Sequence, residues 1–254
     1  MKKNVFVVGC NGKMGQIVLA LIGKSDDMAT TAGFDQVQGG VVASYCAKDL
    51  SVCADTIFNG RDVIIDFSRP EATMKILPYA VQYRIPMVIA TTGFIESQEL
   101  TIKGAARSIP IFKSSNMALS TKRFISLVKY AASIFPAPYE IAIHEDHHSG
   151  KKDAPSGTAK MLFDAVNEGR GGTLVYRFDS NSKKAENEVW VSSGRVGSFR
   201  GDHIVTIAGE NDYVQLKHSI SDRALFAEGA LNAARFIMQQ TESRIYTLDD
   251  LFNE

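Results

Sequence analysis

The stretch Val5 to Gly15, VFVVGCNGKMG, decides the fold because it joins an apolar strand to a helix through a glycine-rich turn. Its first four residues are apolar without alternation, which is typical of a strand in a parallel sheet that is covered on both faces. An apolar stripe at helical spacing follows, made of Met14, Ile17 or Val18, and Leu21. Strand, turn and helix in this order form the context in which a glycine-rich turn binds a dinucleotide.

The turn itself is predicted to bind the cofactor. Glycines let the backbone approach a pyrophosphate closely, and the phosphate charge is favoured at the N-terminus of a helix. The spacing G-x-x-G-x-x-G is a variant of the usual dinucleotide pattern, so a tight turn without a ligand is the alternative interpretation. The predicted cofactor-binding residues of the turn are Gly9, Cys10, Asn11, Gly12, Lys13 and Met14.

A second strand is predicted over residues 30–34, and Asp35 follows it about 20 residues after Gly15. An acidic side chain at this position accepts hydrogen bonds from the ribose hydroxyls of an adenosine group. The next residue is Gln36 rather than an arginine that would bind a 2′-phosphate. We therefore expect NADH to be preferred, although Lys13 keeps NADPH in consideration.

Strands and helices continue to alternate, with strands at 63–67, 86–91 and 109–113 and helices at 71–83 and 96–107. This alternation predicts an α/β fold with a doubly wound parallel sheet, which is Rossmann-like. Ligands bind at the carboxyl ends of such strands, where the loops 66–70, 90–94 and 114–117 lie. These loops contain the other predicted cofactor-binding residues: Ala90, Thr91, Thr92, Ser114, Ser115, Asn116 and Met117.

The pattern changes after Met117. A helix is predicted over 121–133, followed further along by four consecutive strands at 173–178, 188–193, 203–208 and 213–220, with a polar, hairpin-like link at 179–186. Consecutive strands without crossover helices indicate a second, α+β domain with an antiparallel or mixed sheet. A last helix at 225–239 is expected to return to the first domain. The predicted domains are 1–117 plus 225–254, which binds the dinucleotide, and 118–224, which binds the substrate and forms the oligomer.

The candidate active-site segment is 140–158, EIAIHEDHHSGKKDAPSGT, which lies in the second domain. It begins with a short apolar, β-rich stretch and ends at the start of a helix. Between them, the imidazoles of His147 and His148 can gain or lose a proton near neutral pH, and Lys151 supplies positive charge. Neighbouring residues of an extended segment face opposite ways, so the two histidines are expected to have different roles.

The helix start in this segment is predicted to bind an anion. Ser156 is a good N-cap, and the backbone N–H groups of Gly157 and Thr158 would then lie unpaired at the positive end of the helix dipole. Together with the imidazoles and the lysine, this suits a small acidic substrate that is protonated during the reaction. The alternative is a solvated strand end, a charged loop and an ordinary helix cap.

A metal-dependent hydrolase is a competing interpretation of the same residues. His144 to His148 match H-E-x-x-H, which on a helix places two zinc ligands on one face with a glutamate base between them. The apolar alternation at Ile141 and Ile143 favours a strand instead. Residues four apart on a strand are roughly 13 Å from each other and cannot share a metal ion.

Composition narrows the class of protein. The chain has 254 residues, of which 45% are hydrophobic and 22% are charged, which is typical of a globular protein of one large or two modest domains. Lysine plus arginine and aspartate plus glutamate both total 28, which argues against nucleic acid or a membrane surface as the main partner. Three cysteines without framework spacing favour the cytoplasm. The apolar run before Gly9 is too short for a signal peptide.

Residues 147–159, HHSGKKDAPSGTA, match the pattern H-H-x-x-K-x-D-A-P-S-G-T-A at every fixed position, and the chain thereby resembles the dihydrodipicolinate reductase family. The similarity spans nearly the whole chain and includes the turn 9–15, Thr91-Thr92-Gly93, Asn116, the spacing of Arg195, Gly197, Gly201 and His203, and His218 with Arg223, Phe226, Ala227, Gly229 and Ala230. Five residues depart from the family pattern and bear on nicotinamide packing and coenzyme preference: Lys13, Ala90, Met117, Ala118 and Ser120.

The resemblance implies an NAD(P)H-dependent oxidoreductase of diaminopimelate and lysine biosynthesis that reduces 4-hydroxy-tetrahydrodipicolinate by hydride transfer followed by protonation. It implies His147 as proton donor or acceptor and Lys151 as proton donor. The substrate carboxylate would be held by His148, Ser156, Gly157 and Thr158, with Arg223 as a helper. It also implies a homotetramer built through the second domain's sheet, and no metal. A dinucleotide-sensing protein without turnover is a third possible class.

Overall fold

The computed structural model describes residues 1–178 and 183–252, and the chain divides into two compact units. The first unit contains residues 1–118 and 224–254, and the second contains residues 119–223. The chain therefore leaves the first unit once and returns to it once. No helix in the described part of the chain combines the length and the apolar character needed to cross a membrane.

The first unit is built on an eight-stranded sheet in which every described pair is parallel. The strand order is β13-β7-β6-β5-β1-β3-β4, and β2 pairs with β1. This confirms the predicted doubly wound parallel sheet. The strands are β1 (Lys3–Val8), β2 (Met28–Ala29), β3 (Ala32–Phe34), β4 (Ala43–Tyr45), β5 (Val63–Asp66), β6 (Met87–Ile89), β7 (Ile111–Lys113) and β13 (Ile245–Tyr246).

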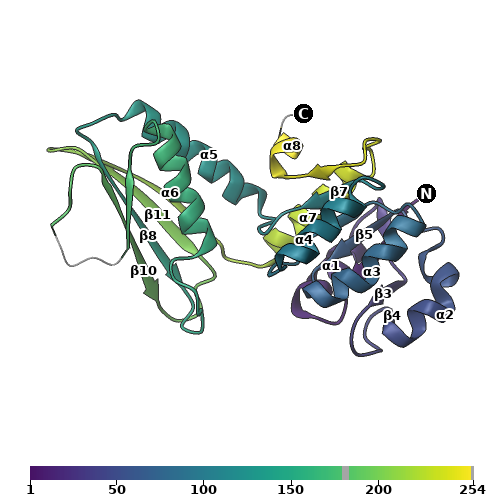
Figure 1. The fold of residues 1–254 in the computed structure, drawn as a ribbon. Helices are drawn as coiled ribbons and strands as arrows, with labels where there is room; N and C mark the ends of the chain where they lie inside the picture. Colours follow the sequence, from purple (N-terminus) through teal and green to yellow (C-terminus); the bar gives the residue numbers. More distant parts are fainter. Residues whose placement is uncertain (179–182, 253–254) are drawn as a thin grey trace. The chain divides into compact units, whose positions relative to one another are not determined.

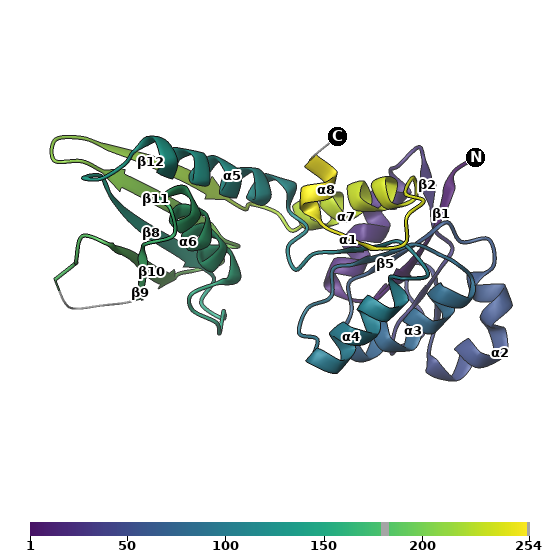
Figure 2. The ribbon, with the colours of Figure 1, turned by 45° about the horizontal axis from the view of Figure 1, so that its top comes forward.

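Helices cover both faces of this sheet (Figures 1 and 2). α1 (Lys13–Gly23) and α7 (Ala224–Ile237) pack together on one face, and α2 (Ala47–Phe58), α3 (Pro70–Gln82) and α4 (Glu96–Ala105) lie on the other. α8 (Leu248–Phe252) follows β13. The residues Val5 to Val8 of β1 have no exposed surface. This burial on both faces is why the strand lacks polar alternation in the sequence.

Several short elements were not predicted. Within the predicted strand 30–34 only Ala32–Phe34 forms a strand, β3, and the elements β2, β4, α2, β13 and α8 were missed. Strands of two or three residues carry too little periodicity to be recognised. The helix α2 is interrupted by a non-helical residue, Cys53, with φ −118° and ψ 18°, so its apolar positions do not follow one helical period.

The second unit contains a mixed five-stranded sheet with the order β12-β11-β8-β10-β9. β8 (Glu140–His147), β10 (Glu188–Arg195) and β9 (Val175–Phe178) run parallel, and β11 (Asp202–Ala208) is antiparallel to both β8 and β12 (Tyr213–Ser219). The helices α5 (Leu119–Ile134) and α6 (Gly157–Gly169) cover one face of it (Figure 1).

This sheet confirms the expectation of a mixed sheet but corrects one connection. The link 179–186 was predicted to be hairpin-like, whereas β9 and β10 pair in parallel. Two parallel strands cannot be joined by a hairpin, because the chain must first return to the end of the sheet at which the first strand began. Residues 179–182 of this link lie outside the described residues.

The packing of α7 in the first unit can be tested at Gly229. A Cβ atom at this position would lie 1.7 Å from the carbonyl oxygen of Met117, so Gly229→Ala forces the helix away from the backbone of Met117. We expect a loss of about 1–3 kcal/mol in the free energy of unfolding, measured by urea denaturation.

Gly104→Ala is the matched control. A Cβ atom at Gly104, in α4, would meet no atom within 4 Å, so alanine should leave stability unchanged or raise it by up to about 1 kcal/mol. Equal denaturation midpoints for the Gly229→Ala variant and the unmodified chain would contradict the packing argument.

Candidate active site

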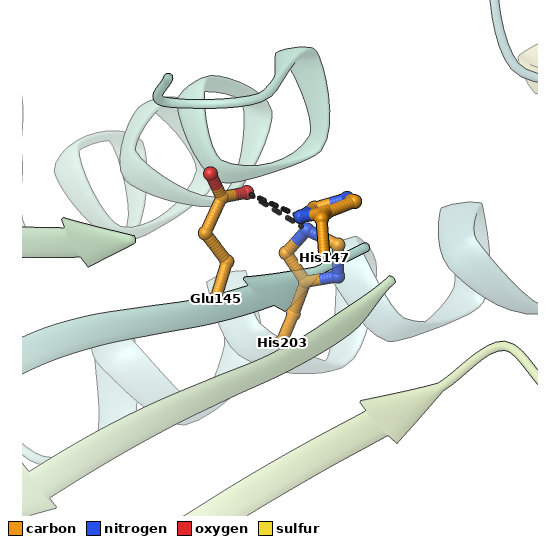
Figure 3. A group of neighbouring side chains, drawn as sticks. All are labelled: Glu145, His147 and His203. Atoms are coloured by element: carbon orange, nitrogen blue, oxygen red, sulfur yellow. Dashed lines mark ion pairs between the residues drawn. The ribbon is translucent and has the colours of Figure 1, made fainter. Parts of the chain in front are cut away.

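The site in the second unit begins with the side-chain alternation of β8. Ile141 and Ile143 point into the core beneath α5 and α6, and the next residues on the same face are Glu145 and His147. Both are buried, with 0% and 7% of their surface exposed. His203 of β11, which is 1% exposed, is the cross-strand partner of Glu145. The strand pattern therefore carries one carboxylate and two imidazoles to the buried face of the sheet, where they lie together (Figure 3).

The two carboxylate oxygens of Glu145 have different surroundings. Oε1 accepts hydrogen bonds from the Ser156 N–H at 2.9 Å and the Ser193 hydroxyl at 2.7 Å. Oε2 lies 3.4 Å from His203 Nε2 and 3.6 Å from His147 Nδ1. Burial would raise the pKa of this carboxyl, but the contact with His203 and the bonds from the two serines outweigh burial and hold the pKa well below its usual range.

The imidazole of His147 is held in its neutral form. Burial lowers its pKa from 6.5 to about 4. The Glu145 carboxylate opposes this shift, while His203, Lys151 and Arg195 add to it. At pH 7 the imidazole therefore carries one proton and has one nitrogen available to accept another.

The N-terminus of α6 lies beside this group, as the sequence predicted. Ser156 is the N-cap, and its hydroxyl accepts a hydrogen bond from the Ala159 N–H at 3.1 Å. The same hydroxyl lies 3.3 Å from His203 Nε2. Gly157 and Thr158 are the first helical residues, where backbone N–H groups have no partner within the helix. The end of this 13-residue helix has the geometry of an anion-binding site.

Lys151 lies in the loop between β8 and α6 and is paired with an acid of the same loop. Its Nζ contacts both carboxylate oxygens of Asp153, at 2.6 and 2.7 Å, and this ammonium lowers the pKa of Asp153. The backbone N–H of Lys151 donates to the carbonyl of His148. Arg195 donates to the carbonyl oxygens of Lys151 and Asp153, at 3.3 and 2.7 Å. The loop is therefore braced from the end of β10.

Arg223 follows β12 at the end of the second unit. The chain passes the site just before it, because the Ile220 N–H donates to the carbonyl of Gly201, and a Cβ at Gly201 would lie 3.3 Å from His147 Nε2. Four members of the site were not among the residues predicted to bind or protonate the substrate: Glu145, Asp153, Ser193 and His203. Glu145 could have been found by extending the alternation of Ile141 and Ile143 by one step.

The structure contradicts the zinc-hydrolase interpretation of His144 to His148. His144 to His147 are in β8 rather than on a helix, and His144 lies on the face opposite to His147. Its ring contacts the Ser192 hydroxyl at 2.8 Å and Asp146 at 3.2 Å. Among the described residues a different set, Glu145, His147 and His203, has its ligating atoms within 4.8 Å of one another.

The residues of the predicted cofactor site lie in the first unit, at the carboxyl ends of the parallel strands. Gly9 has φ +79°, and a Cβ there would lie 2.4 Å from the carbonyl oxygen of Phe67. Gly12 is the N-cap of α1. Asp35 accepts hydrogen bonds from the Asn11 N–H at 2.9 Å and the Gln36 N–H at 2.7 Å, so its carboxylate is held against the glycine turn.

A cavity of about 180 Å³ lies at this turn, and its lining includes a cation that was not among the predicted cofactor-binding residues, Arg69. The other lining residues are Gly9, Gly12, Phe34, Asp35, Gln36, Phe67, Ser68 and Ala72. Lys13 is exposed beside the turn. Cys10 is buried, and its thiol contacts the Ser44 hydroxyl at 3.3 Å, so its side chain does not line the cavity.

The remaining predicted cofactor residues lie on the loops after β6 and β7. The Ala90 N–H donates to Asp66 and the Ser114 N–H to Ile89, which holds both loops to the strand ends. Asp66 is fully buried and also accepts from the hydroxyls of Ser68, Thr73 and Thr91. Thr92 and Ser115 follow on these loops, Asn116 accepts from the Ala118 N–H, and Met117 is 2% exposed.

Comparisons with known proteins match both units. Residues 3–117 match the family described as dihydrodipicolinate reductase, N-terminus, and residues 121–252 match its C-terminus. The 4-hydroxy-tetrahydrodipicolinate reductase of Caldanaerobacter subterraneus subsp. tengcongensis is 38% identical and covers 99% of this chain and 98% of its own. That of Clostridium tetani is 34% identical, with 98% and 96% coverage. The fold resembles dipicolinate-bound dihydrodipicolinate reductase from Paenisporosarcina sp. TG-14, with a TM-score of 0.77, 22% identity and 97% and 98% coverage.

A parallel sheet with a glycine turn, joined in one chain to a unit in which a helix start lies beside a buried acid–histidine group, is typical of a dinucleotide-dependent oxidoreductase. The family matches cover almost the whole of both units. The chain belongs to the dihydrodipicolinate reductase family, which confirms the resemblance carried by residues 147–159.

The lowered pKa of His147 predicts its protonation state. In a pH titration followed by NMR, the ring should titrate near pH 4 and be neutral at pH 7. Since the unfolded chain binds this proton near pH 6.5, stability should fall as the pH is lowered through that value toward 4. The His147→Asn variant lacks this ring, so the resonance that is missing from its spectrum belongs to His147. A midpoint near 6.5 would contradict the assigned burial.

Proposed function

We propose that this chain reduces 4-hydroxy-tetrahydrodipicolinate to tetrahydrodipicolinate with NADH or NADPH, as part of diaminopimelate and lysine biosynthesis. The observation that carries the proposal is the placement of His147 and Glu145 beside the Ser156 helix start, in a chain whose relatives over its whole length are named for this reaction. The dipicolinate reported in a structural relative supports a ring dicarboxylate as the ligand class.

The cofactor is proposed to lie along the glycine turn of the first unit. The turn and the N-terminus of α1 would hold its pyrophosphate, Asp35 its ribose hydroxyls, and the loops at 90–92 and 114–117 its nicotinamide. When bound, the reduced nicotinamide supplies the hydride. The residues that fit this group include Gly9, where a side chain would collide with the Phe67 backbone and close the turn.

The second unit is proposed to bind the substrate carboxylates and to supply a proton. The N-terminus of α6 at Ser156, Gly157 and Thr158 would hold one carboxylate, with His148 and Arg223 as further donors. Reduction of the ring leaves an enamine that must be protonated. Lys151 is a cationic donor, and the neutral His147 can accept a proton or pass one on. To reach the substrate, Lys151 must exchange its bond to Asp153.

Lys151→Ala tests the proton-donor role. In an assay that follows NADH absorbance after addition of freshly made substrate, turnover should fall roughly 10²-fold or more, while NADH affinity stays near that of the unmodified chain. Lys152→Ala is the matched control, because Lys152 is an exposed neighbour in the same loop. Unchanged turnover in Lys151→Ala would remove this lysine from the mechanism.

The same assay separates the proposed function from the alternatives. We propose that no metal is needed, so a chelator should leave activity unchanged. A dinucleotide-sensing protein would bind NADH without substrate-dependent oxidation, and this result would overturn the reductase assignment.

NADH is proposed to be the better coenzyme. The Asp35 carboxylate retains lone pairs for ribose hydroxyls, whereas a 2′-phosphate would bring a second negative charge against it. Two unit charges 4 Å apart at a surface-like dielectric interact by about 4 kcal/mol before screening. Salt and the nearby Lys13 and Arg69 should reduce this to about 1 kcal/mol, or a several-fold difference in KM.

Gln36→Arg should shift the preference toward NADPH by supplying a guanidinium for the phosphate, measured as the ratio of kcat/KM values for the two coenzymes. Gln82→Arg makes the same substitution at the last residue of α3, roughly 18 Å along that helix from its cavity end, and should leave the ratio unchanged. If the unmodified chain instead uses NADPH ten-fold better at moderate salt, the argument from Asp35 is wrong.

We also infer a cytoplasmic homotetramer formed through the second unit's sheet. All three cysteines are free, which suits a reducing compartment. The helices α5 and α6 cover only one face of the sheet. On the other face, a hollow of about 310 Å³ is bordered by Ala142, His144, Trp190, Ser192 and Thr206, among others.

Sedimentation should therefore give about four times the chain mass of 27.8 kDa. Ala142→Arg places a charge on the open face and should lower the assembly state. Gly104→Arg adds the same charge on α4, which belongs to the first unit, and should not lower the assembly state. A monomer at micromolar concentration would contradict this assembly.

A further inference from the structure

Glu145, His147 and His203 form a buried group whose geometry is set by the backbone. Glu145 and His203 are direct partners across the antiparallel pair of β8 and β11. His147 lies two residues further along β8 on the same face, and its ring meets the His203 ring edge-on at 5.3 Å. Since residues on paired strands cannot shift separately, this arrangement is more rigid than one carried by loops.

The contacts of Glu145 leave one oxygen for the histidines. Ser156 and Ser193 both donate to Oε1. Oε2 lies between the two rings, and in the described part of the chain neither Oε2 nor His147 Nδ1 has a partner with hydrogen-bond geometry. Two buried complementary atoms 3.6 Å apart need a shift of only about 0.5 Å to reach bonding distance, and catalytic contacts are commonly long before the substrate binds.

Gly201 lies on the Nε2 side of the His147 ring. A Cβ atom there would lie 3.3 Å from His147 Nε2. The two nitrogens therefore have different surroundings: Nδ1 lies near a carboxylate oxygen, and Nε2 lies near a glycine, where a larger residue would crowd it.

We propose that Glu145 and His203 are positioning residues that hold the His147 ring with its Nδ1–H toward Glu145, so that Nε2 exchanges the proton with the substrate. Glu145 selects this tautomer because a carboxylate accepts and cannot donate. When Nε2 gains a proton, the adjacent carboxylate stabilises the imidazolium that forms. The role of Nε2 rests on the proposed function, whereas the tautomer does not.

His203 has a separate part in this arrangement. Its Nε2 lies 3.4 Å from Glu145 Oε2 and 3.3 Å from the Ser156 hydroxyl, so it contacts both the acid and the cap of α6. Glu145 contacts the same cap through the Ser156 N–H. The groups that orient the imidazole thus also position the helix end proposed to bind the substrate carboxylate.

The test is Glu145→Gln, with Asp146→Asn as the matched control. The glutamine amide keeps the shape but presents N–H groups to the rings, whereas Asp146 undergoes the same chemical change on the opposite face of β8, paired with His144. Nitrogen NMR on the free protein should show His147 with its proton on Nδ1 in the unmodified chain and in Asp146→Asn. In Glu145→Gln the proton should move to Nε2, and the ring should titrate at lower pH, since the Glu145 charge is lost.

Turnover supplies the second readout. The kcat of Glu145→Gln should fall roughly 10²-fold or more with a smaller change in KM, and the limb of the pH–rate profile that belongs to His147 should move to lower pH. Other groups that act electrostatically on His147, namely Lys151, Arg195 and His203, are kept unchanged in this variant. His203→Asn, which keeps the carboxylate, should lower kcat by a smaller factor and serves if Glu145→Gln does not fold.

The outcomes are distinct. An unchanged His147 tautomer in Glu145→Gln, or a proton on Nε2 in the unmodified chain, would overturn the proposal. So would stoichiometric metal in the purified protein that is lost in the Glu145→Gln variant, because the group would then be a metal site. Failure of the unmodified chain to oxidise NADH with the substrate would overturn the proposed function and leave the tautomer result standing.

Discussion

The two-residue period of β8 is the constraint on which the second unit depends. The same alternation that buries Ile141 and Ile143 beneath α6 must also bury Glu145 and His147. A buried carboxylate is tolerated only when donors surround it, and the donors here come from the start of α6, from β10 and from β11. Satisfying this one acid therefore fixes where α6 begins relative to three strands.

The first unit also buries a carboxylate, but the groups that donate hydrogen bonds to it are different. Asp66 is as deeply buried as Glu145, but its side-chain partners are the hydroxyls of Ser68, Thr73 and Thr91. Burial outweighs these neutral donors and raises the pKa of Asp66, whereas contact with His203 and bonds from two serines lower that of Glu145. Asp66 thus ties the ends of β5 and β6 together near the glycine turn, and Glu145 places negative charge beside two imidazoles.

The features that could be predicted from the sequence are those that depend on residues close together in the chain. The apolar run at 5–8, the glycine turn, the alternation up to Lys113 and the Ser156 cap all lie within short windows and were predicted at nearly their observed positions. The partners of Glu145 could not be predicted in this way. Ser193 and His203 are 48 and 58 residues away, and only the register of β10 and β11 against β8 brings them together. The same holds for β13, whose two residues become a strand only by pairing with β7.

The return of the chain to the first unit has a consequence for its synthesis. The helix α7 packs on β5, β6 and β7 and buries eight of its residues, yet it is translated after the whole of residues 119–223. Until α7 leaves the ribosome, only α1 covers that face of the parallel sheet, and the apolar surface that α7 later buries is available to chaperones or to other nascent chains. All residues of the second unit are translated before α7, so this unit can complete its fold before the first unit does.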